Sequence, residues 1–422
     1  MDKNHQVAQV VEKETLPESV VSKAQPINQP LQRRLEINYR RNQKQDQTEL
    51  LDQAGQAFNY HDCSDSYWNP EAFSLLYGTP LWHQASEHQR LVLNQLYWVA
   101  YYSQIISAEI ATIFFNQTSA AGLYAHDGFR TICDMLDLES SQERAHISAF
   151  RRVAEQTEQA LLGKRLFSYP MRGPFSETMI FADTNQLKRW WKQLQLQAFG
   201  LISACNSFLA CQYFTVRGLR TLNGKLVQHQ LSRFCQSDQE NAPIPSKISF
   251  YHFMDESFHF NSSTLLSHDV IRCLPKPTRF EALVANLGIR GCQQDHQRFS
   301  VAVNGIFWHD PALYPQVYEL LRSHIFSMDD ADAKAMMQAC FTQESEGLHR
   351  SYRTHQEAMM SYQVYLEPLD YVWSSNRTMA IMHKASIDKY LRTQQQALSG
   401  FFQDMILAEF GNNEASNGNT HQ

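Results

Sequence analysis

The chain has 422 residues, a formal net charge of −6 at pH 7 and 43% hydrophobic residues. This length can bury a substantial core, in one large helical domain or in two or three smaller ones. The slightly acidic balance gives no basic surface for nucleic acid, and no apolar run is long enough to cross a membrane, so neither partner is expected. Eight cysteines are scattered without a C-x-x-C pair and no signal peptide is evident, which is typical of a cytoplasmic protein.

Residues 1–55 are rich in Gln, Asn, Lys and Arg and contain three prolines. We expect a flexible polar N-terminal arm here, with a helix near residues 31–52. Residues 56–83 combine many aromatic side chains with Pro70 and Pro80. This composition predicts an ordered, irregular segment that wraps against the core.

A long helix is predicted from Ser86 to about Gln117. Ser86 and Gln89 fit a capping box, and apolar residues then recur at helical spacing. Glu109 lies deep in this helix among isoleucines. A Glu on an apolar helix is most often solvated or paired with Lys or Arg, so its role depends on the rest of the chain.

The second helix is predicted from Asp127 to about Leu162, with Gly163 as its stop. It carries Glu139, Glu143 and His146 at positions i, i+4 and i+7, which lie on one helical face. Arginines close to this face make a charged surface the alternative interpretation.

A loop over residues 164–184 leads to a third helix over residues 186–222, bent near Gly200, which contains no Asp or Glu. Residues 223–245 are polar and are expected to form turns. The apolar residues expected in the core of the third helix are Trp190, Trp191, Leu194, Phe199, Ile202, Phe208 and Phe214.

The fourth helix follows Pro243 and Pro245, with Ser246 as a candidate cap. Its central stretch from Phe250 to Phe260 places His252, Glu256 and His259 on one face, surrounded by aromatic residues. Two imidazoles and a carboxylate buried together are costly without a metal ion. Such ligands suit iron, manganese or zinc, and oxygen-rich helical sites favour the first two metals.

The last third of the chain is predicted to be helical near residues 278–288, 313–326, 331–363 and 376–406, followed by a disordered Asn-rich tail over residues 411–422. A further Glu-x-x-His pair, Glu346 and His349, lies among charged residues and is expected on a solvated helix face. No strand-helix alternation and no Gly-rich phosphate loop occurs.

With Glu109, Glu143-x-x-His146 and His252-x-x-x-Glu256-x-x-His259 in this order on successive helices, the chain resembles the ferritin-like di-iron p-aminobenzoate N-oxygenase family. Pro80-Leu81 and Ser86-Glu87-His88-Gln89-Arg90 look like the segment that enters the first ligand helix of that family. The resemblance covers about residues 75–270. It implies an all-α fold with a ferritin-like bundle, which we expect over residues 56–275. The helical pattern of residues 276–410, which the resemblance does not cover, predicts additional C-terminal helices packed on the bundle.

The resemblance also implies that two iron ions are bound by six residues, Glu109, Glu143, His146, His252, Glu256 and His259. The family has a further Glu on the third helix, four residues after a Gly, where this chain has Ala204 after Gly200. Three replacements remain open: a water or substrate group, Gln212, or Glu139. Asp255 is expected either to orient a ligating histidine through its ring N–H or to be an exposed acid.

In the resembled family, iron and O₂ insert oxygen into an arylamine, so the expected function is the O₂-dependent N-oxygenation of a small-molecule amine. No flavin or nicotinamide motif is present, so a ferredoxin or reductase is expected to supply electrons. A homodimer is a possible assembly. The alternatives are a di-iron carbon hydroxylase or desaturase, and a helical binding protein with a degenerate metal site; iron storage suits a chain of this length poorly.

Overall fold

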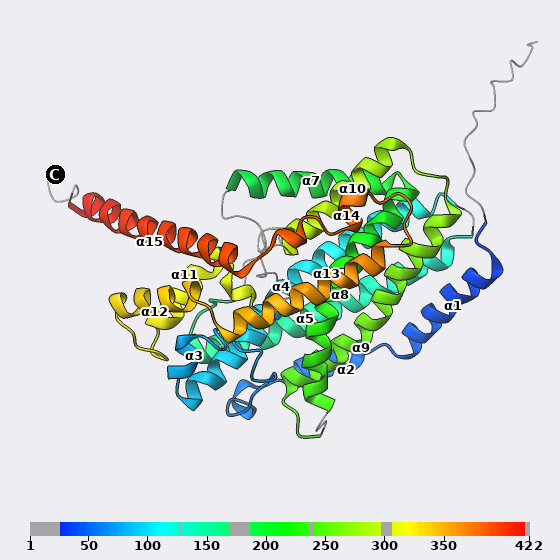
Figure 1. Ribbon diagram of the computed structural model, residues 1–422. Helices are drawn as coiled ribbons and strands as arrows, with labels where there is room; N and C mark the ends of the chain where they lie inside the picture. The colour runs from blue at the N-terminus through cyan, green and yellow to red at the C-terminus, as the bar shows by residue number, and fades with distance from the viewer. Residues whose placement is uncertain (1–25, 127, 169–185, 237–239, 297–305, 418–422) are drawn as a thin grey trace, which may run out of the picture.

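The computed structural model describes residues 26–126, 128–168, 186–236, 240–296 and 306–417 (Figure 1). Within these ranges the regular elements are helices, which confirms the all-α prediction. None of the helices in this part of the chain is both long and apolar enough to cross a membrane.

Four long helices form the centre of the molecule (Figure 1). They are α4 (Glu87–Leu123), α5 (Arg130–Leu162), α8 (Ser207–Gln236) and α9 (Ile244–Thr264). α4 packs mainly against α5, and α8 packs mainly against α9. Helix α7 (Gln186–Ala204) lies on α4 and belongs to the connection between the two pairs. This is a ferritin-like bundle, as the sequence predicts.

The first helix pair has the caps that the sequence specifies. The Ser86 side chain accepts a hydrogen bond from the backbone N–H of Gln89, whose side chain accepts one from Ser86 in return. The helix continues beyond the expected end at Gln117 to Leu123. α5 ends at Leu162 because Gly163 adopts the left-handed conformation, with φ of 65°.

The predicted third helix is two helices, which corrects its expected course. α7 ends at Ala204, and the Asn206 side chain accepts a hydrogen bond from Leu209 N at 3.0 Å as α8 begins. α8 then continues to Gln236, through residues that were expected to form turns. Their apolar members, Val227, Leu231 and Cys235, recur every four residues and are buried, so packing against the bundle outweighs the polar composition.

The expected core of the third helix is only partly correct. Phe208 and Phe214 are buried, and Phe199 and Ile202 pack partly buried against the same cluster. Trp190, Trp191 and Leu194 are instead 57%, 54% and 40% exposed. α7 lies at the edge of the bundle and covers it from one side only, so part of its surface stays exposed (Figure 1).

Helix α9 begins three residues earlier than expected, at Ile244, with Pro243 at the N-cap position. Ser246 is therefore inside its first turn and is not its cap, and its hydroxyl donates to the Trp68 carbonyl at 2.6 Å. Beyond Thr264 the helix widens into a π-helical turn over Leu265–Asp269.

The N-terminal region is more ordered than the flexible arm that its composition predicts for residues 1–55, and the helix expected near residues 31–52 is present as two helices. Helices α1 (Gln29–Lys44) and α2 (Thr48–Ala57) pack across α5 and α9, with Leu31, Leu35 and Leu51 fully buried. A few apolar anchors at helical spacing are enough to order this polar segment. Residues 1–25 of the expected arm lie outside the described part of the chain.

Residues 58–79 form the expected ordered wrap, which buried Asn94 of α4 fastens to the bundle. The Asn94 side-chain oxygen accepts hydrogen bonds from Trp68 N at 2.8 Å and Asn69 N at 3.1 Å. Its amide nitrogen donates to Ser74 Oγ at 2.9 Å, and also approaches the carbonyls of Asn69 and Phe73. The short helix α3 (Pro80–Gln84) then leads into α4.

The C-terminal helices extend the bundle and share its core. They are α10 (Arg279–His296), α11 (Tyr314–Arg322), α12 (Asp330–Thr342), α13 (Glu346–Leu366), α14 (Ser374–Arg377) and α15 (Ile387–Asn417). Leu96 and Phe150 of the bundle belong to the same buried cluster as Trp308 and Phe341. α10 and α13 lie against α8. The tail expected to be disordered from residue 411 is helical as far as Asn417, and residues 418–422 lie outside the described chain.

We predict that Asn94→Leu lowers the free energy of unfolding by about 3 kcal/mol, because two buried backbone N–H groups lose their acceptor. Asn94→Asp should also destabilise the protein, because a buried carboxylate oxygen would face the carbonyls of Asn69 and Phe73 where the amide now donates. Urea denaturation measures the difference, with His88→Ala, exposed on the same helix, as the control. Equal stabilities of Asn94→Leu and the control would exclude this role.

Candidate metal centre

The six residues that the sequence nominates as ligands lie together in the middle of the bundle. They come from three helices: Glu109 from α4, Glu143 and His146 from α5, and His252, Glu256 and His259 from α9. Their ligand atoms form two groups, each lying within 4.8 Å, and Glu256 belongs to both groups. This arrangement of two metal-binding groups with a shared carboxylate is that of a dinuclear site.

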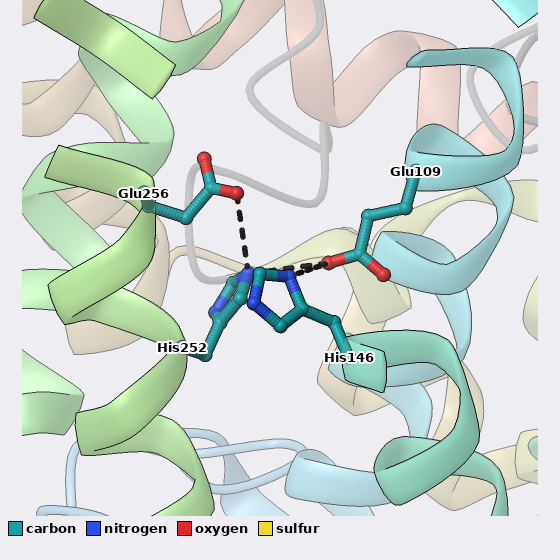
Figure 2. A group of neighbouring side chains, drawn as sticks. All are labelled: Glu109, His146, His252 and Glu256. Carbon is teal, nitrogen blue, oxygen red and sulfur yellow. Dashed lines mark ion pairs between the residues drawn. The ribbon is translucent and has the colours of Figure 1, made fainter. Parts of the chain in front are cut away.

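The first group surrounds Glu109, and Figure 2 shows its four side chains pointing toward one another. The Glu109 oxygen Oε1 lies 3.4 Å from His146 Nδ1 and 3.2 Å from His252 Nε2. Glu256 Oε1 lies 3.7 Å from the same His252 nitrogen. Two carboxylates and two imidazoles therefore converge on one small volume between α4, α5 and α9.

The second group surrounds His259. Its Nδ1 atom lies 3.0 Å from Glu256 Oε1 and 3.4 Å from Glu143 Oε1. The other oxygen of Glu143 lies 3.1 Å from His146 Nδ1, in the first group. Glu143 and Glu256 thus each reach toward both groups, as carboxylates that bridge two metal ions do.

Burial makes this cluster costly without a cation. His146, His252 and His259 are at most 1% exposed, and Glu109 is 4% exposed. Both oxygens of Glu109 and both ring nitrogens of His252 are buried without a hydrogen bond in the described part of the protein. Each such atom loses its hydration without compensation. A metal ion compensates them directly, and this ligand set suits iron, manganese or zinc.

The electrostatics of the site favour cations at the imidazole nitrogens. Burial alone would lower the pKa of His146, but the carboxylates of Asp255 and Glu109, which lie close to its two ring nitrogens, raise it well above its usual range. The pKa of His259 is likewise raised well above its usual range, against the effect of burial, by the charges of Glu256 and Glu143. Burial raises the pKa of Glu109. A metal ion competes with protons for these same atoms.

Two further groups fix the orientation of the imidazoles. Asp255 Oδ2 lies 3.1 Å from His146 Nε2, so the ring N–H there donates to the carboxylate and Nδ1 faces the metal side. Asp255 Oδ1 accepts a hydrogen bond from the backbone N–H of Gln47, between α1 and α2. Asp255 is fully buried rather than an exposed acid.

Gln142 orients the His259 ring, as Asp255 orients the His146 ring. Its side-chain oxygen lies 2.9 Å from His259 Nε2, which directs Nδ1 of this ring toward Glu143 and Glu256. Gln142 is itself held by Asn42 of α1 through two reciprocal hydrogen bonds of 2.9 and 3.1 Å. The sequence analysis missed Gln142 and Asn42, because a single Gln or Asn on a helix carries no distinctive pattern.

The position expected to lack a carboxylate and two of its candidate replacements lie elsewhere. Ala204, at the end of α7, lies beside Gly122, thirteen residues and about 20 Å along α4 from Glu109. Gln212 donates to the Ala285 carbonyl of α10 at 3.1 Å. Glu139 binds the Arg217 guanidinium at 2.7 Å and belongs to neither ligand group among the described residues. The third candidate, a water or substrate group, stays a prediction.

The residue that α8 brings to the site is Arg217, a buried cation that the sequence analysis also missed. Besides Glu139, its guanidinium lies 3.4 Å from Asn116 Oδ1 and 3.8 Å from Glu143 Oε1. The available signal was an arginine between Val216 and Leu219 in a helix without acidic residues.

The remaining Glu-x-x-His pair is at the surface. Glu346 accepts a hydrogen bond from the Tyr77 hydroxyl at 3.2 Å, and His349 pairs with Glu344 at 2.8 Å. Both residues are exposed, as predicted from the charged residues around them.

Comparison with known proteins gave one match. A protein-family model described as "Acyl halogenase CylC-like" matches residues 30–402. This range contains α1, all four helices of the bundle and most of the C-terminal helices. No curated protein and no solved structure matched the chain.

We predict that single substitutions separate the two metal-binding groups. His259→Ala removes a residue of the second group only and should leave roughly one metal ion per chain, whereas Glu256→Ala should disturb both groups. Metal content is measured after anaerobic loading with ferrous iron and gel filtration. His349→Ala, in the exposed pair, is the matched control. Equal metal content in all three variants would contradict the assignment.

We also predict that Asp255→Ala lowers metal affinity by about 10- to 100-fold without removing a ligand, because His146 loses the partner that fixes its ring. Titration with cobalt(II), followed by its visible absorption, measures the affinity. Asp137→Asn, at an exposed position of α5, should bind as tightly as the unmodified protein. An unchanged affinity of Asp255→Ala would show that His146 is positioned by packing alone.

Proposed function

This chain belongs to the CylC-like acyl halogenase family, and we propose that it replaces a hydrogen atom of an acyl chain with a halogen in an O₂-dependent reaction. The observation that carries the proposal is the family match over residues 30–402, together with two buried carboxylate and imidazole groups inside that range. The N-oxygenation of an amine, expected from the resemblance, has no support from this match. Both interpretations share a di-iron site in a ferritin-like bundle.

The donor set fits iron, which would supply the activation of O₂. Glu109, His146 and His252 would hold one ion, His259 the other, and Glu143 and Glu256 lie within reach of both. Asp255 and Gln142 keep the N–H of His146 and His259 at Nε2, so that Nδ1 of each ring faces the metal side. The chain's own contribution is therefore a fixed set of ligands in a site from which bulk water is excluded.

The balance of the reaction requires an external electron donor. A C–H bond is broken, a C–halogen bond is formed from a halide ion, and O₂ is reduced to water. This balance consumes two electrons and three protons beyond those of the substrate and the halide. Because the sequence contains no flavin or nicotinamide motif, we propose that a ferredoxin or reductase supplies the electrons.

Aromatic side chains next to the site suit an acyl substrate. The rings of Phe150 and Tyr102 lie 5.1 and 5.8 Å from the His252 ring. Tyr101 packs against Tyr102, and Tyr97 stacks on Tyr101 at 5.9 Å, one turn further from the metal groups. Three of these buried rings come from α4 and one from α5, and their faces suit contact with a hydrocarbon chain better than with a charged amine.

We predict that the protein loaded with ferrous iron halogenates a medium-chain fatty acyl thioester when O₂, chloride or bromide, and a chemical reductant are present. Mass spectrometry detects the product by its halogen isotope pattern. Glu256→Ala should abolish the product, and His349→Ala should retain it. A hydroxylated or desaturated acyl product in saturating halide would instead support the carbon hydroxylase or desaturase alternative.

A further inference from the structure

Helix α8 faces the metal centre with a cation where the related helical sites have an acid. Ferritin-like di-iron proteins place a carboxylate on each of four helices. In this chain α4, α5 and α9 provide carboxylates, whereas α8 contains no Asp or Glu and contributes Arg217. This side chain is 6% exposed, and it approaches both Glu139 and Glu143 of α5.

The two ligand groups contain one carboxylate fewer than a site with an acid on each of four helices. Glu109, Glu143 and Glu256 belong to the groups, and α8 adds no acid. Asp255 supplies a fourth buried negative charge, but it binds Nε2 of His146, away from the metal side. The charge of Arg217 is balanced by Glu139 at 2.7 Å. A small anion from solution would occupy the coordination position that the acid leaves open.

We propose that this position binds a halide ion, held between the metal pair and the Arg217 guanidinium. The inference rests on the proposed function, for which the halide is a substrate. Glu139 and Asn116 hold Nη1 of the guanidinium, while Nη2 lies 3.8 Å from Glu143 Oε1, on the side of the second ligand group. Arg217 is thus a specificity-determining residue: it admits a monovalent anion where a carboxylate would exclude it.

The choice of arginine predicts which halides bind. A guanidinium is planar, delocalised and weakly hydrated, so it pairs best with anions that lose their hydration easily. Chloride and bromide meet this requirement better than fluoride does. The order of affinity should therefore be bromide, then chloride, then fluoride.

The test measures halide binding directly, without turnover. Protein loaded with cobalt(II) is titrated with sodium bromide or chloride at constant ionic strength, and the visible absorption of the cobalt reports a change of its ligands. We expect a saturable change in the unmodified protein. Arg217→Gln should weaken halide affinity by about tenfold or more, because a charged hydrogen-bond donor is lost. Glu139→Gln should strengthen it, because the guanidinium loses its competing anion.

Three further variants keep the test decisive. Should Arg217→Gln fail to fold because Glu139 is left buried and unpaired, the uncharged pair Arg217→Gln/Glu139→Gln retains the shape of the site and should show the same loss of affinity. Arg350→Gln is the matched control: it removes an arginine that stacks on Phe73 at 4.6 Å, outside both ligand groups, and should bind halide normally. Arg217→Glu should bind metal and no longer respond to halide.

An absent halide response in the unmodified protein, or unchanged halide affinity in both the Arg217→Gln and the double variant, would overturn the inference. Its failure is distinguishable from failure of the proposed function. Halide binding that depends on Arg217, without any halogenated product, would leave the inference standing and refute the acyl halogenase. Halogenation with the same halide dependence in Arg217→Gln as in the unmodified protein would support the acyl halogenase and refute the role of Arg217 in halide binding.

Discussion

The burial of six ionisable side chains in one small volume is the constraint on which the rest of this structure depends. Three glutamates and three histidines meet inside a helical bundle, where the loss of hydration is expensive unless cations and hydrogen bonds replace it. The sequence meets this demand through spacing, because residues three and four apart on a helix share one face. Aromatic and aliphatic residues around that face keep bulk water away from the site, which increases the need for cations and hydrogen bonds there.

The four central helices contribute different kinds of charged side chain to the site. α4, α5 and α9 carry the acids and imidazoles, whereas α8 carries a guanidinium that pairs with Glu139 of α5. The electrostatic asymmetry sets the metal centre apart from the symmetric arrangement of one acid per helix. A cation in place of an acid changes the chemistry that the site can perform. The fold stays ferritin-like, because the Arg217 and Glu139 side chains pair with each other inside the bundle.

The parts of the site that obey helical periodicity could be predicted from the sequence, and the parts that depend on tertiary contacts could not. Helical spacing indicates that His252, Glu256 and His259 share one face. The order of Glu109 and Glu143 before them in the chain indicates the bundle. The break at Cys205 and Asn206 carries no strong signal, so the position opposite the metals was assigned to Ala204 of α7 rather than to Arg217 of α8. Exposure of Trp190 and burial of Leu35 likewise depend on which helices cover which.

The short N-terminal helix α1 and the turn after it are connected to both metal-binding groups through one intermediary each. Asn42 holds the Gln142 side chain beside His259, and the Gln47 backbone holds Asp255 beside His146. These contacts span 100 and 208 residues of sequence. A local opening of α1 would therefore loosen both rings at once, giving metal ions a route for exchange that does not require the bundle to unfold.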